Sequence, residues 1–378
     1  MRVREMQSDD YAAVHRVRVE NGLGAQSPES WRHFDNNPHR SAGEPLPRGW
    51  VLEDETGQVV GVFCFYPVRY RWKKRSLLAG VAHTLAIDKQ HRLSTAMLMA
   101  PLARQSGVDF VLTTSASEAP ARYYQFLQFH RLPVAYFQQM LCWVVNYRKV
   151  AKAALQQRKL GWARKLSLPA AAGLRLAHAL SGRNRFGRRS AQVRRIETFD
   201  ERFDRFWGRL AECSPRLLAM RDRASLQWHF EFGLRNDRVR VLTLENGIEM
   251  AGYAILFREF RQPQQLLDRY HLVDLQVLEP RPETIEPLMA GALELARSEG
   301  IGMLDVVGLD LPKRRILERL HPYVRSTKRS PYWYKSLRTV DGLDLESSEV
   351  WDPTLFDGDA TIWSAASESH LADGPMTS

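Results

Sequence analysis

The sequence predicts two α/β units of the same architecture, joined by a basic helical segment. Its 378 residues exceed what one typical hydrophobic core accommodates, so two domains are expected. The order of strands and helices predicted for the first half recurs in the second half. Across the junction of the two halves, the stretch from Ala119 to Ile196 contains sixteen Lys or Arg residues and no Asp or Glu. We therefore expect domains over 1–147 and 193–340, a basic helical linker over 148–192 and an acidic tail over 341–378.

The bulk composition excludes several classes of protein. Hydrophobic residues make up 44% and charged residues 26% of the chain, as in ordinary globular proteins. The charged N-terminus lacks the apolar run of a signal peptide, and no apolar segment approaches the about 18 residues that span a bilayer. Cys64, Cys142 and Cys213 are widely separated and show no metal-ligand spacing. We expect no metal and a cytoplasmic location, where thiols stay reduced.

The first half is predicted to have the order β-α-α-β-β-β-α-β-α-β. Ser8-Asp9-Asp10 offers an N-cap to the first helix, and Thr56-Gly57 marks a hairpin between two apolar strands. Helical periodicity and short apolar runs set the other elements. The predicted strands cover 3–6, 50–53, 59–66, 77–87, 110–113 and 135–147, and the predicted helices cover 8–21, 28–36, 96–106 and 119–129.

The second half is predicted to repeat this order with little shared sequence. Asn246-Gly247 is a strong turn signal between two of its strands. The predicted strands cover 193–196, 239–245, 250–257, 271–278, 303–307 and 332–337, and the helices cover 199–213, 224–231, 283–300 and 313–320. The predicted fold class is α/β of the α+β kind. Each half forms a mixed, mostly antiparallel sheet flanked by helices.

The loop between the strand 77–87 and the helix 96–106 is a candidate anion site. Its sequence is Gln90-His91-Arg92-Leu93-Ser94-Thr95. A helix N-terminus favours a phosphate, because its first N–H groups lack helical partners and the helix dipole is positive there. Ser94 and Thr95 can cap the helix, and Arg92 can offer a positive charge.

This loop resembles the pyrophosphate loop of the GNAT (Gcn5-related N-acetyltransferase) family, whose signature is [Gln/Arg]-x-x-Gly-x-[Gly/Ala]. Gln90 and Arg92 fit that pattern, whereas Leu93 and Thr95 replace its small residues. Tyr124 to Phe129 also resembles the family's Tyr-x-x-x-Gly-Phe segment, with Gln128 in place of glycine. The resemblance implies that residues 90–95 bind the pyrophosphate of acyl-CoA and that Tyr124 reprotonates the leaving thiolate.

Amine acylation also needs a group that accepts a proton. The family often uses a carboxylate on the fourth strand, but the strand 77–87 contains none. His83 is its titratable side chain, and a histidine suits a base near neutral pH. Glu118, just after the strand 110–113, is the second candidate. The loop of the second half, Glu279 to Glu283, has two prolines and two glutamates, so we expect no CoA there.

The resemblance extends to tandem-GNAT acyltransferases, including those encoded with bacterial polysaccharide biosynthesis systems. It implies acyl transfer from acyl-CoA to an amine of a small molecule or of an envelope or polysaccharide precursor. Two alternative hypotheses for the function stay open. Transferases of the Fem type also use two GNAT-like domains but take aminoacyl-tRNA, and a GNAT-like fold can serve as a non-catalytic scaffold. We rank tRNA below acyl-CoA and expect no DNA.

The sequence also predicts the structure and the partner of the basic linker. Residues 150–179 are expected to form helices broken near Pro169 and Gly173, with basic and apolar residues alternating. Such a segment, over residues 148–195, can meet an anionic membrane surface or an anionic acceptor. It can equally pack against the acidic tail.

Overall fold

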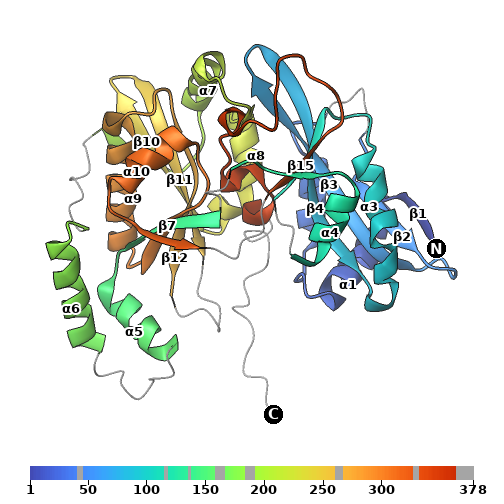
Figure 1. Cartoon of the computed structure of the whole chain (residues 1–378), viewed down its shortest axis with the longest axis horizontal. Helices are drawn as coiled ribbons and strands as arrows, with labels where there is room; N and C mark the ends of the chain where they lie inside the picture. Colours follow the sequence, from blue (N-terminus) through green and yellow to red (C-terminus); the bar gives the residue numbers. More distant parts are fainter. Residues whose placement is uncertain are drawn as a thin grey trace.

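Two mixed β-sheets with flanking helices make up the protein. The computed structural model describes residues 1–40, 46–114, 118–134, 138–157, 167–183, 192–259, 267–326 and 332–362. The two sheets lie side by side, and α7, α8 and the C-terminal segment lie between them (Figure 1). This confirms the predicted fold class.

The first sheet is antiparallel except for one central pair. β4 and β5 run parallel, with Ala79 opposite Phe110 and Ala82 opposite Thr113. In spatial order the strands are β1 (Arg2–Glu5), β2 (Gly49–Glu53), β3 (Val59–Trp72), β4 (Arg75–Ile87), β5 (Phe110–Thr113), β15 (Trp333–Ser336) and β6 (His130–Arg131), with β9 (Leu218–Ala219) paired to β3.

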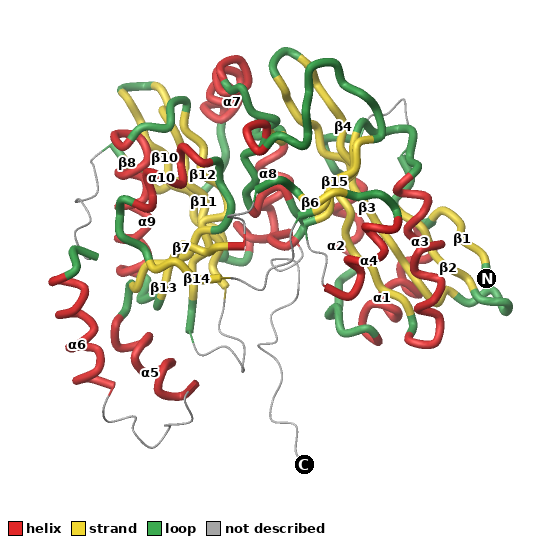
Figure 2. Tube along the Cα trace, viewed as in Figure 1, coloured by secondary structure: helices red, strands yellow, loops and turns green. Residues whose placement is uncertain are grey.

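The second sheet repeats this arrangement. Its parallel pair is β12 and β13, with Arg269 opposite Met303. In spatial order the strands are β14 (Tyr323–Ser326), β7 (Gln139–Val144), β13 (Met303–Val306), β12 (Arg269–Val277), β11 (Glu249–Glu259), β10 (Val239–Asn246) and β8 (Val193–Ile196). The predicted duplication of architecture is therefore present (Figure 2).

The two halves exchange strands: the first half gives β7 to the second sheet, and the second half gives β15 and the two-residue β9 to the first sheet. β7 comes from the first half but pairs with β13 and β14 of the second half. β15 comes from the second half and lies between β5 and β6. Sequence periodicity identifies a strand but not its pairing partner, so the exchange was not predicted. The expected domain ranges 1–147 and 193–340 thus interlock, and their boundaries stay a prediction.

Helices cover both sheets. Aspartate side chains cap several of them: Asp222, for example, accepts a hydrogen bond from the Ser225 amide at the start of α8. The helices are α1 (Tyr11–Glu20), α2 (Pro28–Asp35), α3 (Thr95–Ala103), α4 (Glu118–Phe126), α5 (Tyr147–Gln157), α6 (Ser167–Leu180), α7 (Glu201–Cys213), α8 (Arg223–Arg235), α9 (Pro282–Ser298) and α10 (Leu311–Glu318). No helix in these ranges is long and apolar enough to cross a membrane.

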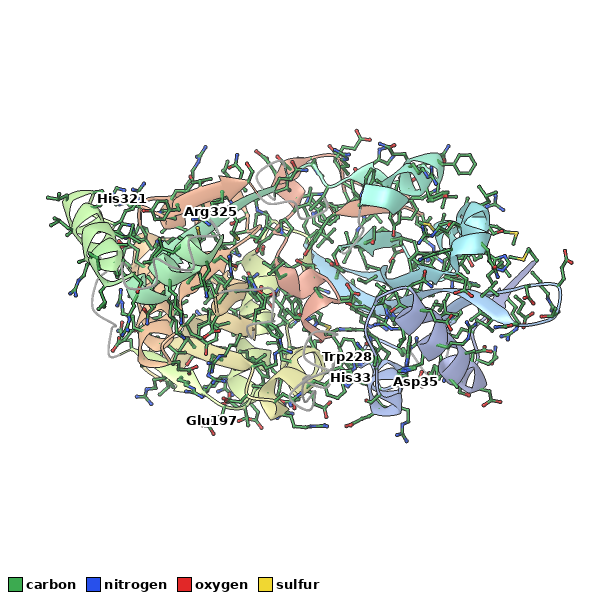
Figure 3. All side chains as sticks on the ribbon, turned by 90° about the horizontal axis from the view of Figure 1, so that it is seen from below. His33, Asp35, Glu197, Trp228, His321 and Arg325 are labelled. Atoms are coloured by element: carbon green, nitrogen blue, oxygen red, sulfur yellow. The ribbon has the colours of Figure 1, made fainter. Side chains whose placement is uncertain are left out.

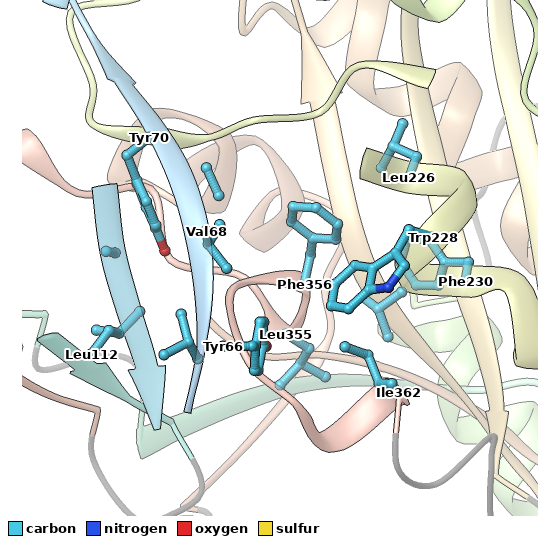
Figure 4. Close-up of a cluster of buried hydrophobic side chains, with 14 of the residues drawn as sticks. Tyr66, Val68, Tyr70, Leu112, Leu226, Trp228, Phe230, Leu355, Phe356 and Ile362 are labelled. Atoms are coloured by element: carbon cyan, nitrogen blue, oxygen red, sulfur yellow. The ribbon is translucent and has the colours of Figure 1, made fainter. Parts of the chain in front are cut away.

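Two predictions about the linker and the tail need correction. α6 continues through Pro169 and Gly173, because Pro169 lies in its first turn, where proline removes no helical hydrogen bond. The predicted acidic tail is buried from Trp351 to Ile362, apart from Ala360, whereas most of residues 341–350 are exposed. Trp351, Phe356 and Ile362 pack with Tyr66 and Trp228 in the core between the sheets (Figure 4). Burial of its large apolar side chains stabilises this placement.

The buried acids of this segment meet cations of the second half rather than the linker. Asp352 pairs with the Lys313 ammonium, and both side chains are buried. Asp357 lies 3.8 Å from the guanidinium of Arg221, which also forms a two-point ion pair with Asp274. Burial raises the pKa of Asp357 to about 6 even though Arg221 acts against it. The segment is thus fixed by both apolar contacts and charge.

Candidate active site

The parallel pairing of β4 and β5 stops halfway along β4. It ends at the Ala82–Thr113 pair, while β4 continues to Ile87. Thr84 then interrupts the pairing of β4 with β3 and has a φ of 50°, in the left-handed region. The guanidinium of Arg18 in α1 donates a hydrogen bond to the Thr84 hydroxyl. Beyond Ala82 and Thr113 the two strands are no longer paired, and the gap in the pairing there is the candidate active site.

Tyr124 lies at the closed end of this gap. Its hydroxyl is 3.4 Å from the Thr113 hydroxyl, and its ring stacks on Trp333 with centroids 5.9 Å apart. Burial raises the pKa of Tyr124 to about 12, and the Asp359 carboxylate contributes to the rise. Tyr124 thus keeps its proton at neutral pH, which a general acid requires.

The loop 90–95 begins the helix α3 beside the gap. Residues Lys89–Ser94 form a 3-10 helix, and none of residues 90–95 has a positive φ. The missing glycines are therefore not required by the backbone here. The Leu93 side chain is 94% exposed, so it lies on the loop surface. Gln90 and Arg92 are also exposed, and the Gln90 amide lies 3.1 Å from the His91 ring.

The two possible capping residues behave differently. Ser94 is the N-cap residue of α3, but its side chain makes no capping bond. The Thr95 hydroxyl donates to the Arg92 carbonyl, which also accepts a bond from Tyr123 of α4. The loop is thus held to the helix that carries Tyr124. The start of α3 has no side-chain cap, and the Thr95 amide bonds to the Arg92 carbonyl of the preceding 3-10 helix.

The glycine missing from the Tyr124–Phe129 segment has a different consequence. Gln128 has a φ of 61°, a conformation that glycine adopts without strain. It ends α4, where the Phe129 amide bonds to the Tyr124 carbonyl. At this position the glycine of the family pattern corresponds to a left-handed backbone, and Gln128 adopts that conformation with strain.

His83 is next to Thr84 in the gap and is buried. Its Nδ1 lies 3.1 Å from the Thr84 hydroxyl, and its ring stacks on Phe34 with centroids 4.6 Å apart. Burial, followed by the charges of Arg18 and Arg40, holds the pKa of His83 well below its usual range. His83 is thus neutral but a weak base. Glu118, the other predicted base, begins α4, and its side chain lies outside the described residues.

The C-terminal segment also borders this site, which its sequence did not predict. Gly358 packs so closely on Thr114 that a Cβ at this position would come within 2.1 Å of the Thr114 hydroxyl. Asp359 follows and is buried, and its carboxylate raises the pKa values of Tyr66 and Tyr124. No local signal marks Asp359, because it is about 245 residues away from Thr114 in sequence. Only Gly358, in an otherwise acidic stretch, hints at a close approach.

α8 of the second half closes the site on one side. The Trp228 indole donates to the His33 carbonyl at 2.9 Å and stacks on the His33 ring (Figure 3). His229 contacts the Thr361 hydroxyl at 2.7 Å. Trp228 and His229 thus hold the two halves and the C-terminal segment together.

The described part of the site is closely packed. A cavity bordered by His83, Phe34 and Arg40 has a volume of about 10 Å³, enough for about one water molecule. Within the described residues, no group of His, Cys, Asp or Glu side chains is arranged to hold a metal ion. The site residues described above provide an acid in Tyr124, a buried carboxylate in Asp359 and a helix start at α3.

Comparisons with known proteins identify the fold. No known family model matches the sequence, and no curated protein matches it. Among solved structures, a GCN5-related N-acetyltransferase from Anabaena variabilis aligns over 89% of this chain and 73% of its own, at 10% identity and a TM-score of 0.57. A conserved protein of unknown function from Enterococcus faecalis, described as a probable N-acyltransferase, aligns over 89% and 72%, at 10% identity and a TM-score of 0.56.

These likenesses define the class of fold. The chain has the fold of GCN5-related N-acetyltransferases, and each of its two sheets carries the same strand order. At 10% identity, the likeness concerns the fold alone.

Proposed function

We propose that the protein transfers an acyl group from acyl-CoA to an amine in the gap between β4 and β5. The observation that carries the proposal is the Tyr124 hydroxyl at the end of the parallel pairing, beside the start of α3. An acyl-CoA whose thioester carbonyl lies in this gap would have its sulfur near Tyr124 and its pyrophosphate near residues 90–95. In this mechanism the backbone amides after Gln90, together with the Arg92 guanidinium, hold the pyrophosphate.

The reaction needs one proton acceptor and one proton donor. The amine attacks the thioester carbon and gives up a proton, and the C–S bond breaks as the thiolate takes the proton of Tyr124. We assign the acceptor role to Asp359, directly or through one water molecule. It is a buried carboxylate coupled electrostatically to Tyr124, whereas the depressed pKa of His83 makes that histidine a weak base. His83 and Glu118 stay the alternative acceptors.

The charges in the gap suggest a class of acceptor. Arg18 and Asp359 are buried, and each affects the other electrostatically. The positive charge of Arg18 suits an anionic group of the acceptor, and the negative charge of Asp359 suits its amine. An amino-sugar or lipid-linked envelope or polysaccharide precursor with a phosphate meets this description. We also propose a cytoplasmic location, supported by the free thiols of Cys64, Cys142 and Cys213.

Titration calorimetry with acetyl-CoA and longer acyl-CoAs tests the donor. Binding should weaken in Arg92→Ala while the fold is kept. Release of the CoA thiol in the presence of amines then tests transfer. Tyr124→Phe should lower kcat by a factor of about 10² to 10⁴ without changing donor affinity, whereas Tyr334→Phe, a buried tyrosine on β15, should not. No binding at millimolar acyl-CoA would refute the donor assignment.

The role of Asp359 has its own test. Asp359→Asn should lower kcat and change the acidic limb of the pH–rate profile, because a protonated acceptor cannot take a proton. Asp341→Asn, an exposed aspartate earlier in the same segment, is the matched control. An unchanged pH profile in Asp359→Asn would return the role to His83 or Glu118.

A Fem-like reaction with aminoacyl-tRNA is the second candidate. Leu93 and Thr95 in place of small residues and the basic linker favour it, because neither feature is needed for CoA. Binding of aminoacyl-tRNA without binding of acyl-CoA would select it. Absence of both would leave a scaffold role.

A further inference from the structure

We propose that α6 docks on the surface of an anionic membrane. α6 is a helix of 14 residues at the edge of the molecule (Figure 1). Ten of these residues are exposed, and nine of the ten are Leu, Ala, Gly or Pro. Leu168, Leu176 and Leu180 are 58%, 62% and 81% exposed. A helix exposed to water normally carries charged residues on its outer face, but the outer face of α6 carries only Arg175.

The exposure of α6 results from how the helix is anchored. Ser167, Ala171 and His178 are its buried residues. The His178 ring contacts the Tyr147 hydroxyl of α5 at 3.1 Å and the Tyr323 hydroxyl of β14 at 2.5 Å. α5 in turn packs Val150 and Ala153 beside a small apolar cluster of the second sheet. α6 is therefore the outer helix of an anchored hairpin, held by one narrow face.

The surrounding charge indicates the kind of surface that covers α6. From Tyr147 to Ile196 the chain has fourteen Lys or Arg residues and no acid. These cations precede and follow α6 in the sequence, whereas α6 itself contains one. An apolar helix bordered by cations on both sides suits the boundary between acyl chains and anionic headgroups.

The length of α6 excludes a membrane-spanning helix, and the charge of the surrounding sequence opposes contact with a second copy of the chain. Fourteen residues give a helix of about 21 Å, shorter than the about 30 Å apolar core of a bilayer, so α6 lies in the interface rather than across it. A second copy of the chain on α6 would bring two acid-free, strongly basic segments together, and like charges oppose that contact. The surface is therefore anionic lipid rather than another copy.

Vesicle flotation with the full chain tests the proposal. The protein should float with vesicles of equal parts phosphatidylglycerol and phosphatidylcholine, less at high salt, and not with phosphatidylcholine alone. Leu176→Glu/Leu180→Glu should lower the partition coefficient by about 100-fold, since each buried leucine contributes about tenfold. The matched control is Ile248→Glu, which changes an exposed apolar residue (94%) in the β10–β11 turn and should bind like the wild type.

The charge contribution is measured separately. Arg148→Gln/Lys152→Gln/Arg175→Gln should lower binding by about fivefold per charge. Circular dichroism and sedimentation velocity accompany each variant. Equal flotation with neutral and anionic vesicles, or a wild-type dimer that Leu176→Glu/Leu180→Glu converts to a monomer, would overturn the proposal. Vesicle binding needs no acyl-CoA, so its outcome is independent of the proposed reaction.

Discussion

Replacing Asp274 by Asn should destabilise the protein by about 3 kcal/mol, because it leaves the Arg221 guanidinium buried with less compensating charge. Both side chains are fully buried, and their two contacts are 3.0 and 3.2 Å long. Removing one member of such a pair typically costs about 3 to 5 kcal/mol. The lower end applies here, because Asp357 lies 3.8 Å from Arg221 and supplies part of the missing charge.

The free energy of unfolding in urea measures this effect. Glu249→Gln is the control, because Glu249 pairs with Arg209 at 2.5 Å while both side chains are about half exposed. Such a surface pair contributes less than about 1 kcal/mol. Arg221→Met/Asp274→Leu should be less destabilised than the sum of the single variants, since no buried charge remains. If Asp274→Asn and Glu249→Gln cost the same, burial of the pair is not what sets its energy.

Two further predictions concern local stability and pH. Gln128→Gly should raise the free energy of unfolding by about 0.5 to 1 kcal/mol, because it relieves a left-handed backbone at φ 61°. Gln227→Gly, inside α8, should lower it by about 1 kcal/mol, and a loss at both positions would contradict the strain argument. Burial lowers the pKa of His271, but Asp305 and Glu259 outweigh it and raise the pKa to about 9. The imidazolium therefore stabilises the fold fully below pH 6.5, and about 3 kcal/mol is lost as pH rises through 9. Urea titrations across this range should show the decline in the wild type but not in His271→Gln, and a flat wild-type profile would disprove it.

Local patterns were sufficient to predict most elements. β5 and β8 match their predicted ranges: β5 is a short apolar run, and β8 begins and ends with a β-branched residue. β6 and β9 were missed because two residues show no period, and β14 was missed because its largely exposed sequence Tyr-Val-Arg-Ser forms no apolar run. The exchange of β7 and β15 depends on pairing over long sequence distances, which periodicity does not encode.

The candidate site likewise has residues that a local motif predicts and one that it does not. Tyr124 and residues 90–95 were found because they resemble a local motif. Asp359 was not, because its place depends on burial of Trp351 and Phe356 between the sheets. In sequence these residues belong to a stretch predicted as an acidic tail that could pack against the basic linker. Net charge alone was a poor guide, since a few large apolar side chains decide whether such a stretch is buried.

The exchange of β7 and β15 makes the two halves mutually dependent. Expressed alone, either half would have an incomplete sheet with exposed backbone donors and acceptors. A break in the chain between α5 and β8 would still leave two fragments interlocked through these strands. The arrangement is what results when two copies of one ancestral subunit trade their last strands and are then fused head to tail. The covalent connection is thus free to change in length and charge, and here it carries α6.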